Sequence, residues 1–276
     1  MKFTKMHGLG NDYVYVDAAR ATVADPAVLA RAIADRHTGV GSDGLILIVP
    51  SDKADVRMVM YNADGSRAEM CGNGIRCVAK YAVDHGLCDR HDLAIETDAG
   101  VKRVWCHLRD SRVDSVRVDM GVPNLASRDL PAEVEPERMV DYPMHVGPHE
   151  FNVTGVSMGN PHAVVFVDEL HRIDLVDIGP QMERATLFPN RINVHFVRVD
   201  NESHVTVRTW ERGSGATRAC GTGACAVCVA GAVTGRTRRA VTTELPGGAL
   251  LIEWADDDHV YMTGPAVEVF QGEWPA

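Results

Sequence analysis

The sequence predicts an α/β protein made of two equivalent domains, and two observations lead to this prediction. First, strand-like runs alternate with short helices along all 276 residues. Second, the run CGNGIRCVAKYAVDHG that begins at Cys71 returns as CGTGACAVCVAGAVTG at Cys220, an offset of 149 positions (220 − 71 = 149). Similarity at one long and fixed offset indicates two whole domains rather than a solenoid of short repeats.

Two further segments repeat at the same offset. The run VRMVMYN that ends at Asn62 corresponds to VTVRTWE ending at Glu211, and GLGN ending at Asn11 corresponds to SMGN ending at Asn160. Two copies of one domain related by an approximate twofold axis present equivalent residues to a shared cleft, and interfaces between domains are common ligand sites. We therefore expect the two repeated cysteines to face each other across such a cleft.

The elements of the first domain follow from local signals. The turn Gly-Leu-Gly-Asn separates two alternating runs, Pro26 suits the first turn of a helix, and Gly86 suits a helix C-cap. In order, we expect strands at 3–6 and 13–17, a helix at 26–36, strands at 45–49 and 56–61, a helix from 71 to near 86, and strands ending at 95, at 102–108 and at 115–120. The second domain is expected to repeat this order.

The stretch from 122 to 148 holds five of the 13 prolines and many charges, so we expect a loose inter-domain connection there. VDMGVP at 118–123 resembles VYMTGP at 260–265, and both are interpreted as points where the chain passes between domains. The predicted division is a first domain of residues 1–118 with a returning strand at 265–276, and a second domain of residues 119–264.

Composition excludes several classes of protein. A net charge of −10 and a pI near 5.6 argue against nucleic-acid binding, which relies on Lys and Arg to neutralise phosphates. The N-terminus MKFTKMHGLGND has no apolar core like that of a signal peptide, and the longest uncharged run, at 224–233, is too short to span a bilayer. We expect a soluble, cytoplasmic protein with no membrane or nucleic-acid partner.

The chain has seven cysteines, which is an odd number, and the sequence shows no export signal. We therefore do not expect a disulfide framework. The spacing of Cys220, Cys225 and Cys228 matches the first three ligands of a plant-type iron–sulfur site, which keeps a redox protein as one alternative. No cysteine follows to supply the fourth ligand, and the surrounding Ala/Val-rich run reads as a buried helix, so we predict no metal. Apart from the two repeated cysteines, the thiols are interpreted as small apolar fillers: Cys77, Cys88, Cys106, Cys225 and Cys228.

The glycines that follow each repeated cysteine indicate an anion site. Gly72 and Gly221 let a ligand approach the backbone, and the N–H groups at the start of the following helix stay open. The partial positive charge of a helix N-terminus stabilises both a substrate carboxylate and a neighbouring thiolate. The alternative is that these glycines only form a tight turn without a ligand. The presence of two copies, each with a cysteine, argues against this alternative.

Polar residues near the helix starts are further candidates. Arg212 could bind a carboxylate and Glu211 an ammonium group, although the two could also form a surface ion pair. The amides of Asn11, Asn62 and Asn160 could bind both ends of an amino acid, although asparagine in a turn is often only a turn former. His162 could shuttle protons or could be structural.

Three motifs together closely resemble the diaminopimelate epimerase family: GLGNDY at 8–13, MCGNGIRC at 70–77 and ERGSGATRACGTG at 211–223. The resemblance extends over essentially the whole chain. It implies two pseudo-symmetric α/β (α+β) domains, each a mostly antiparallel, barrel-like sheet around a central helix. It also implies a cofactor-independent homodimeric enzyme that interconverts LL- and meso-diaminopimelate in lysine and peptidoglycan-precursor biosynthesis.

The resemblance also assigns roles to residues. Cys71 is expected to act as the acid and Cys220 as the base, with support from His162 and Glu211. The expected substrate contacts are Asn11, Asn62, Gly72, Asn73, Asn160, Asn193, Glu211, Arg212, Gly221 and Thr222. The chain departs from some members by having Gly44 where they carry Gln, which removes a side-chain contact, and Thr222 where Ser is common.

Opposed thiols suit racemisation because one removes the α-proton while the other protonates the opposite face. Helix N-termini would hold the developing charge, so no pyridoxal cofactor is needed. Each sulfur would lie about 3–3.5 Å from the α-carbon at the moment of proton transfer. One cysteine must be a thiolate while the other is a thiol, which predicts a bell-shaped pH dependence of activity. Proline racemase and hydroxyproline epimerase are the main alternative, but that family typically has His where this chain has Asn73. A binding protein without catalysis would not need both thiols.

Overall fold

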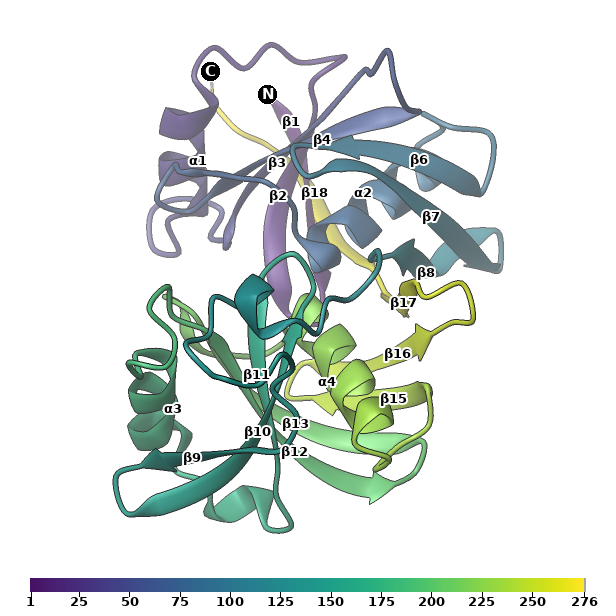
Figure 1. Cartoon of the computed structure of the whole chain (residues 1–276). Helices are drawn as coiled ribbons and strands as arrows, with labels where there is room; N and C mark the ends of the chain where they lie inside the picture. Colours follow the sequence, from purple (N-terminus) through teal and green to yellow (C-terminus); the bar gives the residue numbers. More distant parts are fainter. Residues whose placement is uncertain (276) are drawn as a thin grey trace. The chain divides into compact units, whose positions relative to one another are not determined.

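The computed structural model describes residues 1–275 and divides into two compact units (Figure 1). The first unit is Met1–Asp119 together with the C-terminal segment that begins at Thr263, and the second is Met120–Met262. None of the helices in residues 1–275 combines the length and the apolar character needed to span a membrane.

The sheet of the first unit is mostly antiparallel, with the pairs β2–β3 and β4–β6 running parallel. In paired order it consists of β18 (Val267–Glu273), β1 (Lys2–Gly8), β2 (Asn11–Asp17), β3 (Gly44–Val49), β4 (Val56–Asn62), β6 (Asp92–Thr97), β7 (Gly100–Arg109) and β8 (Arg112–Asp119), with the short β5 (Arg67–Ala68) beside β4. The chain end therefore completes the sheet of the unit in which the chain starts.

Two helices pack on this sheet. Helix α1 (Pro26–Ala34) begins where the Asp25 side chain accepts a hydrogen bond from the Val28 amide at 3.0 Å, and its Ala30 and Ile33 join the core formed with β2 and β3. Helix α2 (Gly72–Asp84) is buried almost throughout and contacts β1, β2, β4, β6, β7 and β8, so it is the central helix of the unit.

The second unit has the same plan, with β11–β12 and β13–β15 as its parallel pairs. Its strands are β9 (Tyr142–Val146), β10 (His149–Ser157), β11 (Pro161–Phe166), β12 (Asn193–Asn201), β13 (His204–Glu211), β14 (Gly215–Thr217), β15 (Ala240–Leu245), β16 (Gly248–Trp254) and β17 (Val260–Pro265), which carries the chain out of this unit. Its helices are α3 (Leu175–Glu183), the buried α4 (Gly221–Val233), and the 3₁₀ turns Ser127–Asp129 and Leu170–Arg172.

The helices confirm the repeat predicted from the sequence. Helix α3 begins and ends at the counterparts of the first and last residues of α1, and α4 does the same for α2 (175 − 26 = 183 − 34 = 149 and 221 − 72 = 233 − 84 = 149). Both central helices also end in the same way, because Gly86 and Gly235 adopt positive φ and the chain closes a Schellman motif, with Leu87 N bonded to Ala82 O in the first copy. The repeat therefore includes the positions of the helices and the way in which the central helices end.

Two expectations about the elements are wrong in detail. The first helix ends at Ala34 rather than 36, because the Asp35 carboxylate accepts from the amides of His37 and Thr38 and turns the chain. The stretch 122–148 is not a loose connection. Its apolar residues Leu130 and Met139 are buried in the core of the second unit, and β9 lies within it.

Candidate active site

In the first unit, Cys71 is the N-cap residue of α2. Its backbone is extended, and its sulfur accepts a hydrogen bond from the Gly74 amide at 3.4 Å, at the positive end of the helix. The Asn11 Oδ1 atom accepts from the Cys71 sulfur at 3.3 Å and from the Asn73 side-chain nitrogen Nδ2 at 3.2 Å. The predicted residues Asn11, Cys71, Gly72 and Asn73 therefore lie together at the start of the central helix.

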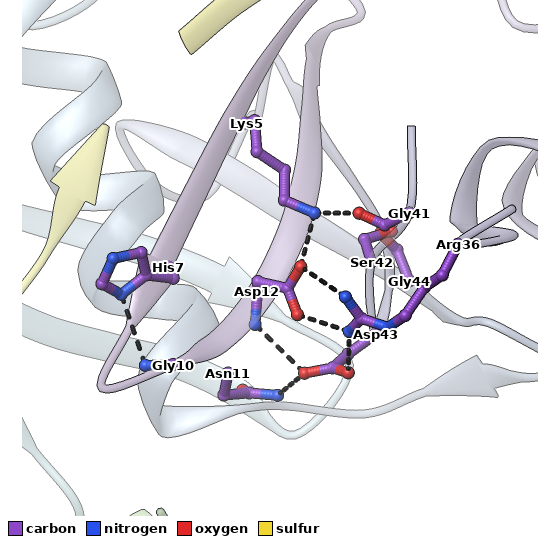
Figure 2. Close-up of polar contacts among 10 residues, drawn as sticks. All are labelled: Lys5, His7, Gly10, Asn11, Asp12, Arg36, Gly41, Ser42, Asp43 and Gly44. Atoms are coloured by element: carbon purple, nitrogen blue, oxygen red, sulfur yellow. Dashed lines mark hydrogen bonds and ion pairs between the residues drawn. The ribbon is translucent and has the colours of Figure 1, made fainter. Parts of the chain in front are cut away.

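A network of charged side chains holds the side-chain amide of Asn11 in place (Figure 2). The Asp43 Oδ2 atom accepts from the Asn11 side-chain amide at 2.7 Å and from the Asp12 backbone amide at 3.1 Å. Arg36 Nη2 bridges the Asp12 and Asp43 carboxylates at 2.7 and 2.9 Å, while the buried Lys5 ammonium contacts the other oxygen of Asp12. Two cations thus balance two carboxylates.

The network has a consequence for protonation. Burial raises the pKa of Asp12, but its hydrogen bonds to Arg36 and Lys5 and the charges of these two residues outweigh burial, so the pKa lies below its ordinary value. Asp12 stays ionised, and Lys5 keeps a charged partner together with the Gly41 carbonyl.

Asn62 lies at the end of β4, and its contacts in this structure are local. Its side-chain amide donates to Ser66 Oγ at 2.9 Å, and its backbone amide bonds the Ser66 carbonyl. The side chain thus closes the turn that leads toward α2, which is the turn-former role weighed from the sequence.

In the second unit, Cys220 is the N-cap of α4 and is only 5% exposed. Its sulfur lies 3.7 Å from Thr222 Oγ1. Burial, followed by the negative charge of Glu211, raises the pKa of the Cys220 thiol well above its ordinary value, although hydrogen bonds from the Gly223 amide and Thr222 act in the opposite direction. The sequence predicts that the helix end favours the thiolate, whereas burial and the Glu211 charge favour the neutral thiol in this structure.

Glu211 is the last residue of β13, Arg212 follows it, and the two side chains have different partners. The Glu211 carboxylate accepts from Thr217 Oγ1 at 2.5 Å, and burial raises its pKa. The Arg212 backbone amide donates to Asn193 Oδ1 at 2.9 Å, and the Asn193 side-chain nitrogen donates to Pro161 O at 2.8 Å. Asn193 therefore joins the starts of β11 and β12 to the Glu211–Arg212 turn.

A chain of polar side chains runs behind Cys220. Asn160 Nδ2 lies 3.4 Å from Thr222 Oγ1, and Asn160 Oδ1 lies 2.9 Å from His162 Nε2. The other His162 nitrogen, Nδ1, lies 2.9 Å from His195 Nε2, and His195 Nδ1 lies 2.9 Å from Thr209 Oγ1. Burial lowers the pKa of His162 well below its ordinary value and that of His195 to about 3, so both imidazoles are neutral at pH 7.

Sequence reasoning missed the residues that support the predicted ones. They are Lys5, Asp12, Arg36 and Asp43 in the first unit and His195 and Thr209 in the second. A signal existed for one of them, because His195 stands on the buried face of a strand at the position where the first copy has Ile46.

Three comparisons relate the chain to known proteins. A family model described as diaminopimelate epimerase matches residues 3–126 and 154–269. The diaminopimelate epimerase of Acetivibrio thermocellus is 51% identical over 274 residues, covering 99% of this chain and 98% of that protein. The diaminopimelate epimerase of Methanococcus maripaludis is 48% identical over 274 residues, covering 99% of each.

Solved structures give the same fold at lower identity. A probable proline racemase from Agrobacterium radiobacter superposes with a TM-score of 0.71 at 16% identity, covering 99% of this chain and 92% of that one. A phenazine biosynthesis protein of Bacillus anthracis superposes with a TM-score of 0.68 at 18% identity, covering 100% and 99%. At these identities the likeness concerns the fold alone, and it confirms the predicted mixed α/β class.

Proposed function

Because the chain belongs to the diaminopimelate epimerase family, we propose that it interconverts LL- and meso-diaminopimelate for lysine and peptidoglycan-precursor biosynthesis. Support comes from the match to relatives of that name over nearly the full length of both chains. We place the reaction in the cytoplasm and assign it to a homodimer that uses no cofactor.

One observation carries the proposed mechanism: each unit has a cysteine as the N-cap of its buried central helix, at equivalent positions of the repeat. In the proposal, the two thiols act on opposite faces of one α-carbon. The Cys220 thiolate takes the α-proton, the carbanionic charge spreads into the substrate carboxylate, and the Cys71 thiol gives its proton to the other face. The products are a Cys220 thiol and a Cys71 thiolate, and the reverse reaction restores the first state.

Open backbone amides would hold the developing charge. Gly72 at the start of α2, and Gly221 and Thr222 at the start of α4, lie in the first helical turn, where backbone N–H groups have no intrahelical acceptors. Such preorganised donors favour the charge that grows in the transition state and make an α-proton accessible to a thiolate.

In the proposal, the substrate helps to activate Cys220, because burial raises the pKa of its thiol. Besides burial, the negative charge of Glu211 is a cause of this rise. A substrate ammonium group bound beside Glu211 would offset that charge, lower the pKa of Cys220 and favour its thiolate. Arg212 would bind a substrate carboxylate, while Asn11, Asn62, Asn160 and Asn193 would divide the remaining polar groups of the ligand among them.

The proposal is tested by following hydrogen exchange in D2O. Reduced protein without added cofactor is incubated with LL-diaminopimelate, and NMR reports α-hydrogen exchange and meso product, with L-proline in a parallel sample. We expect both signals with diaminopimelate alone. Turnover of proline alone would reassign the substrate, and no exchange with either would refute the epimerase function.

Variants test the two-thiol mechanism. Cys71→Ala and Cys220→Ala should each abolish turnover, because each removes one of the two proton carriers. Cys88→Ala is the matched control, since Cys88 is a partly buried thiol beyond the C-terminal end of α2 and should retain activity. Full activity in either of the first two variants would exclude the mechanism.

A further inference from the structure

The second unit brings two histidines and a cysteine together in its interior. His162, His195 and Cys220 each offer one ligand atom, and these atoms all lie within 4.8 Å of one another. Both histidines are fully buried and the cysteine is 5% exposed. Imidazole nitrogen and thiolate sulfur are the ligands preferred by zinc and similar soft divalent cations.

The outer nitrogens of both imidazoles already have oxygen partners. His162 Nε2 lies 2.9 Å from Asn160 Oδ1, and His195 Nδ1 lies 2.9 Å from Thr209 Oγ1. The inner nitrogens, His162 Nδ1 and His195 Nε2, point at each other at 2.9 Å. A histidine that ligates a metal typically donates its other N–H to such an oxygen, which fixes the ring and its tautomer. The outer shell of a metal site is therefore in place.

The internal repeat shows that the fold does not require these polar groups. The counterparts of His195 and Thr209 in the first copy are Ile46 and Met60, both buried in the first unit (195 − 46 = 209 − 60 = 149). Burying polar side chains costs free energy that apolar ones avoid. The second copy nevertheless places a histidine and a threonine opposite each other on the neighbouring strands β12 and β13.

The His195 ring also lies directly against the start of α4. A Cβ atom on Gly223 would lie 2.2 Å from His195 Cε1, so only glycine leaves room for the ring. This contact sets the imidazole next to the turn of helix that Cys220 caps.

We propose that Cys220, His162 and His195 form a binding site for a soft divalent cation such as Zn²⁺, and that occupancy inhibits the enzyme. One sulfur–metal bond and two nitrogen–metal bonds form. The Cys220 thiol proton passes to solvent, and the proton between the imidazoles moves to His195 Nδ1, where it is donated to Thr209 Oγ1. One proton is released for each cation bound. The inhibition rests on the proposed role of Cys220, whereas the binding does not.

Co²⁺ is the probe, because a cobalt–thiolate bond absorbs in the near ultraviolet and reports binding without turnover. Reduced full-length protein is titrated anaerobically with Co²⁺ in thiol-free buffer, and Zn²⁺ is then added. We expect one equivalent of Co²⁺ to give the thiolate band and Zn²⁺ to displace it. The band should be lost in Cys220→Ser and kept in Cys71→Ser, which retains every proposed ligand.

Thr209→Val tests the outer shell. Loss of an outer-shell partner typically weakens metal binding by about 10–100-fold, and we expect a fall in Co²⁺ affinity of that size. Thr243→Val is the matched control, because Thr243 is equally buried, its hydroxyl has no hydrogen-bond partner within the described residues, and it should bind Co²⁺ like the wild type.

Several results would overturn the proposal. They are the absence of a thiolate band, a band that persists in Cys220→Ser, and a band lost in Cys71→Ser. If the serine variants do not fold, X-ray absorption of the Zn²⁺-loaded wild type decides, because the site requires one sulfur at about 2.3 Å and two imidazole nitrogens at about 2.0–2.1 Å. If the protein binds Co²⁺ but Zn²⁺ does not inhibit its epimerase activity, the inhibitory role is refuted. If the protein binds Co²⁺ but has no epimerase activity, only the proposed function is refuted.

Discussion

The Asn11 side-chain nitrogen donates to Asp43 Oδ2 at 2.7 Å (Figure 2), and this bond decides which end of the amide faces Cys71. A carboxylate only accepts hydrogen bonds, so a flipped amide would set two oxygens against each other. The Asn11 oxygen is thereby left to accept from the Cys71 sulfur and from the Asn73 side-chain nitrogen. Asp43 is thus a positioning residue, acting on the thiol through Asn11.

The first prediction is that Asp43→Asn slows the epimerase. Asparagine can present its own amide to Asn11, so the orientation of Asn11 is no longer fixed. Loss of a hydrogen bond to a charged group costs about 1.5–3 kcal/mol, which corresponds to about one to two orders of magnitude in kcat/KM. Steady-state kinetics measure this loss. Asp92→Asn, which breaks an exposed ion pair with Arg103, is the control and should change little. Wild-type kinetics in Asp43→Asn would remove the positioning role.

The second prediction concerns acid stability. Burial of Asp12 is outweighed by hydrogen bonds and charges from Arg36 and Lys5, which lower the pKa of Asp12 below its ordinary 3.8. A carboxyl group with a lowered folded-state pKa adds stability that is complete above the unfolded pKa and is lost as pH falls through the folded one. Asp12→Asn should therefore reduce the free energy of unfolding by a constant amount from pH 7 to 5, and the difference from wild type should shrink below about pH 3.8. Urea unfolding across this range measures it, and a difference that grows toward low pH would contradict the assignment.

The parts of the fold that the sequence predicts are those that repeat. The pattern of the central helix, with its cysteine N-cap and its glycine C-cap, appears twice in the sequence, and two copies make each local signal unambiguous. The network behind Asn11 appears once. Lys5, Asp12 and Asp43 belong to strands or turns in which charged residues are common, and only the folded chain brings them to the buried side of Asn11.

The sequence alone also does not predict the direction of the pKa shift of Cys220. Position at a helix N-terminus predicts a low pKa for Cys220, but sequence does not reveal that the sulfur is almost fully buried beside the Glu211 carboxylate. Burial is the largest cause, and it reverses the sign of the predicted shift.

The third prediction concerns Gly44, the position at which the family resemblance implies Gln in some members. Gly44 begins β3, and its counterpart in the repeat is Asn193, which begins β12. A Cβ atom at Gly44 would lie 2.1 Å from the Tyr61 carbonyl oxygen and 3.0 Å from the Tyr13 ring. Since backbone must move, Gly44→Ala and Gly44→Gln should each lose about 1–3 kcal/mol of stability without any gain in substrate affinity.

Thermal and urea unfolding measure this loss. Gly100→Ala is the control, because a Cβ atom there meets no atom within 4 Å and only the positive φ of 98° is unfavourable, at a cost of about 1–2 kcal/mol. A Gly44→Gln variant with wild-type stability and tighter binding of diaminopimelate would show that the strand pair yields to a side chain at this position.

The fourth prediction separates the electrostatic role of Glu211 from its catalytic one. Besides burial, the carboxylate charge raises the pKa of Cys220, so Glu211→Gln should lower that pKa, increase the thiolate fraction at pH 8 and speed alkylation of Cys220 by iodoacetamide. Turnover should nevertheless fall, because the proposed contact with the substrate ammonium is lost. Burial remains in the variant and keeps the pKa above its ordinary value. Peptide mapping after timed alkylation gives the rate at this one cysteine, with Glu244→Gln, at a partly exposed side chain, as control. Slower alkylation in Glu211→Gln would mean that the carboxylate assists ionisation of the thiol, and the base role would then require Glu211 as its proton acceptor.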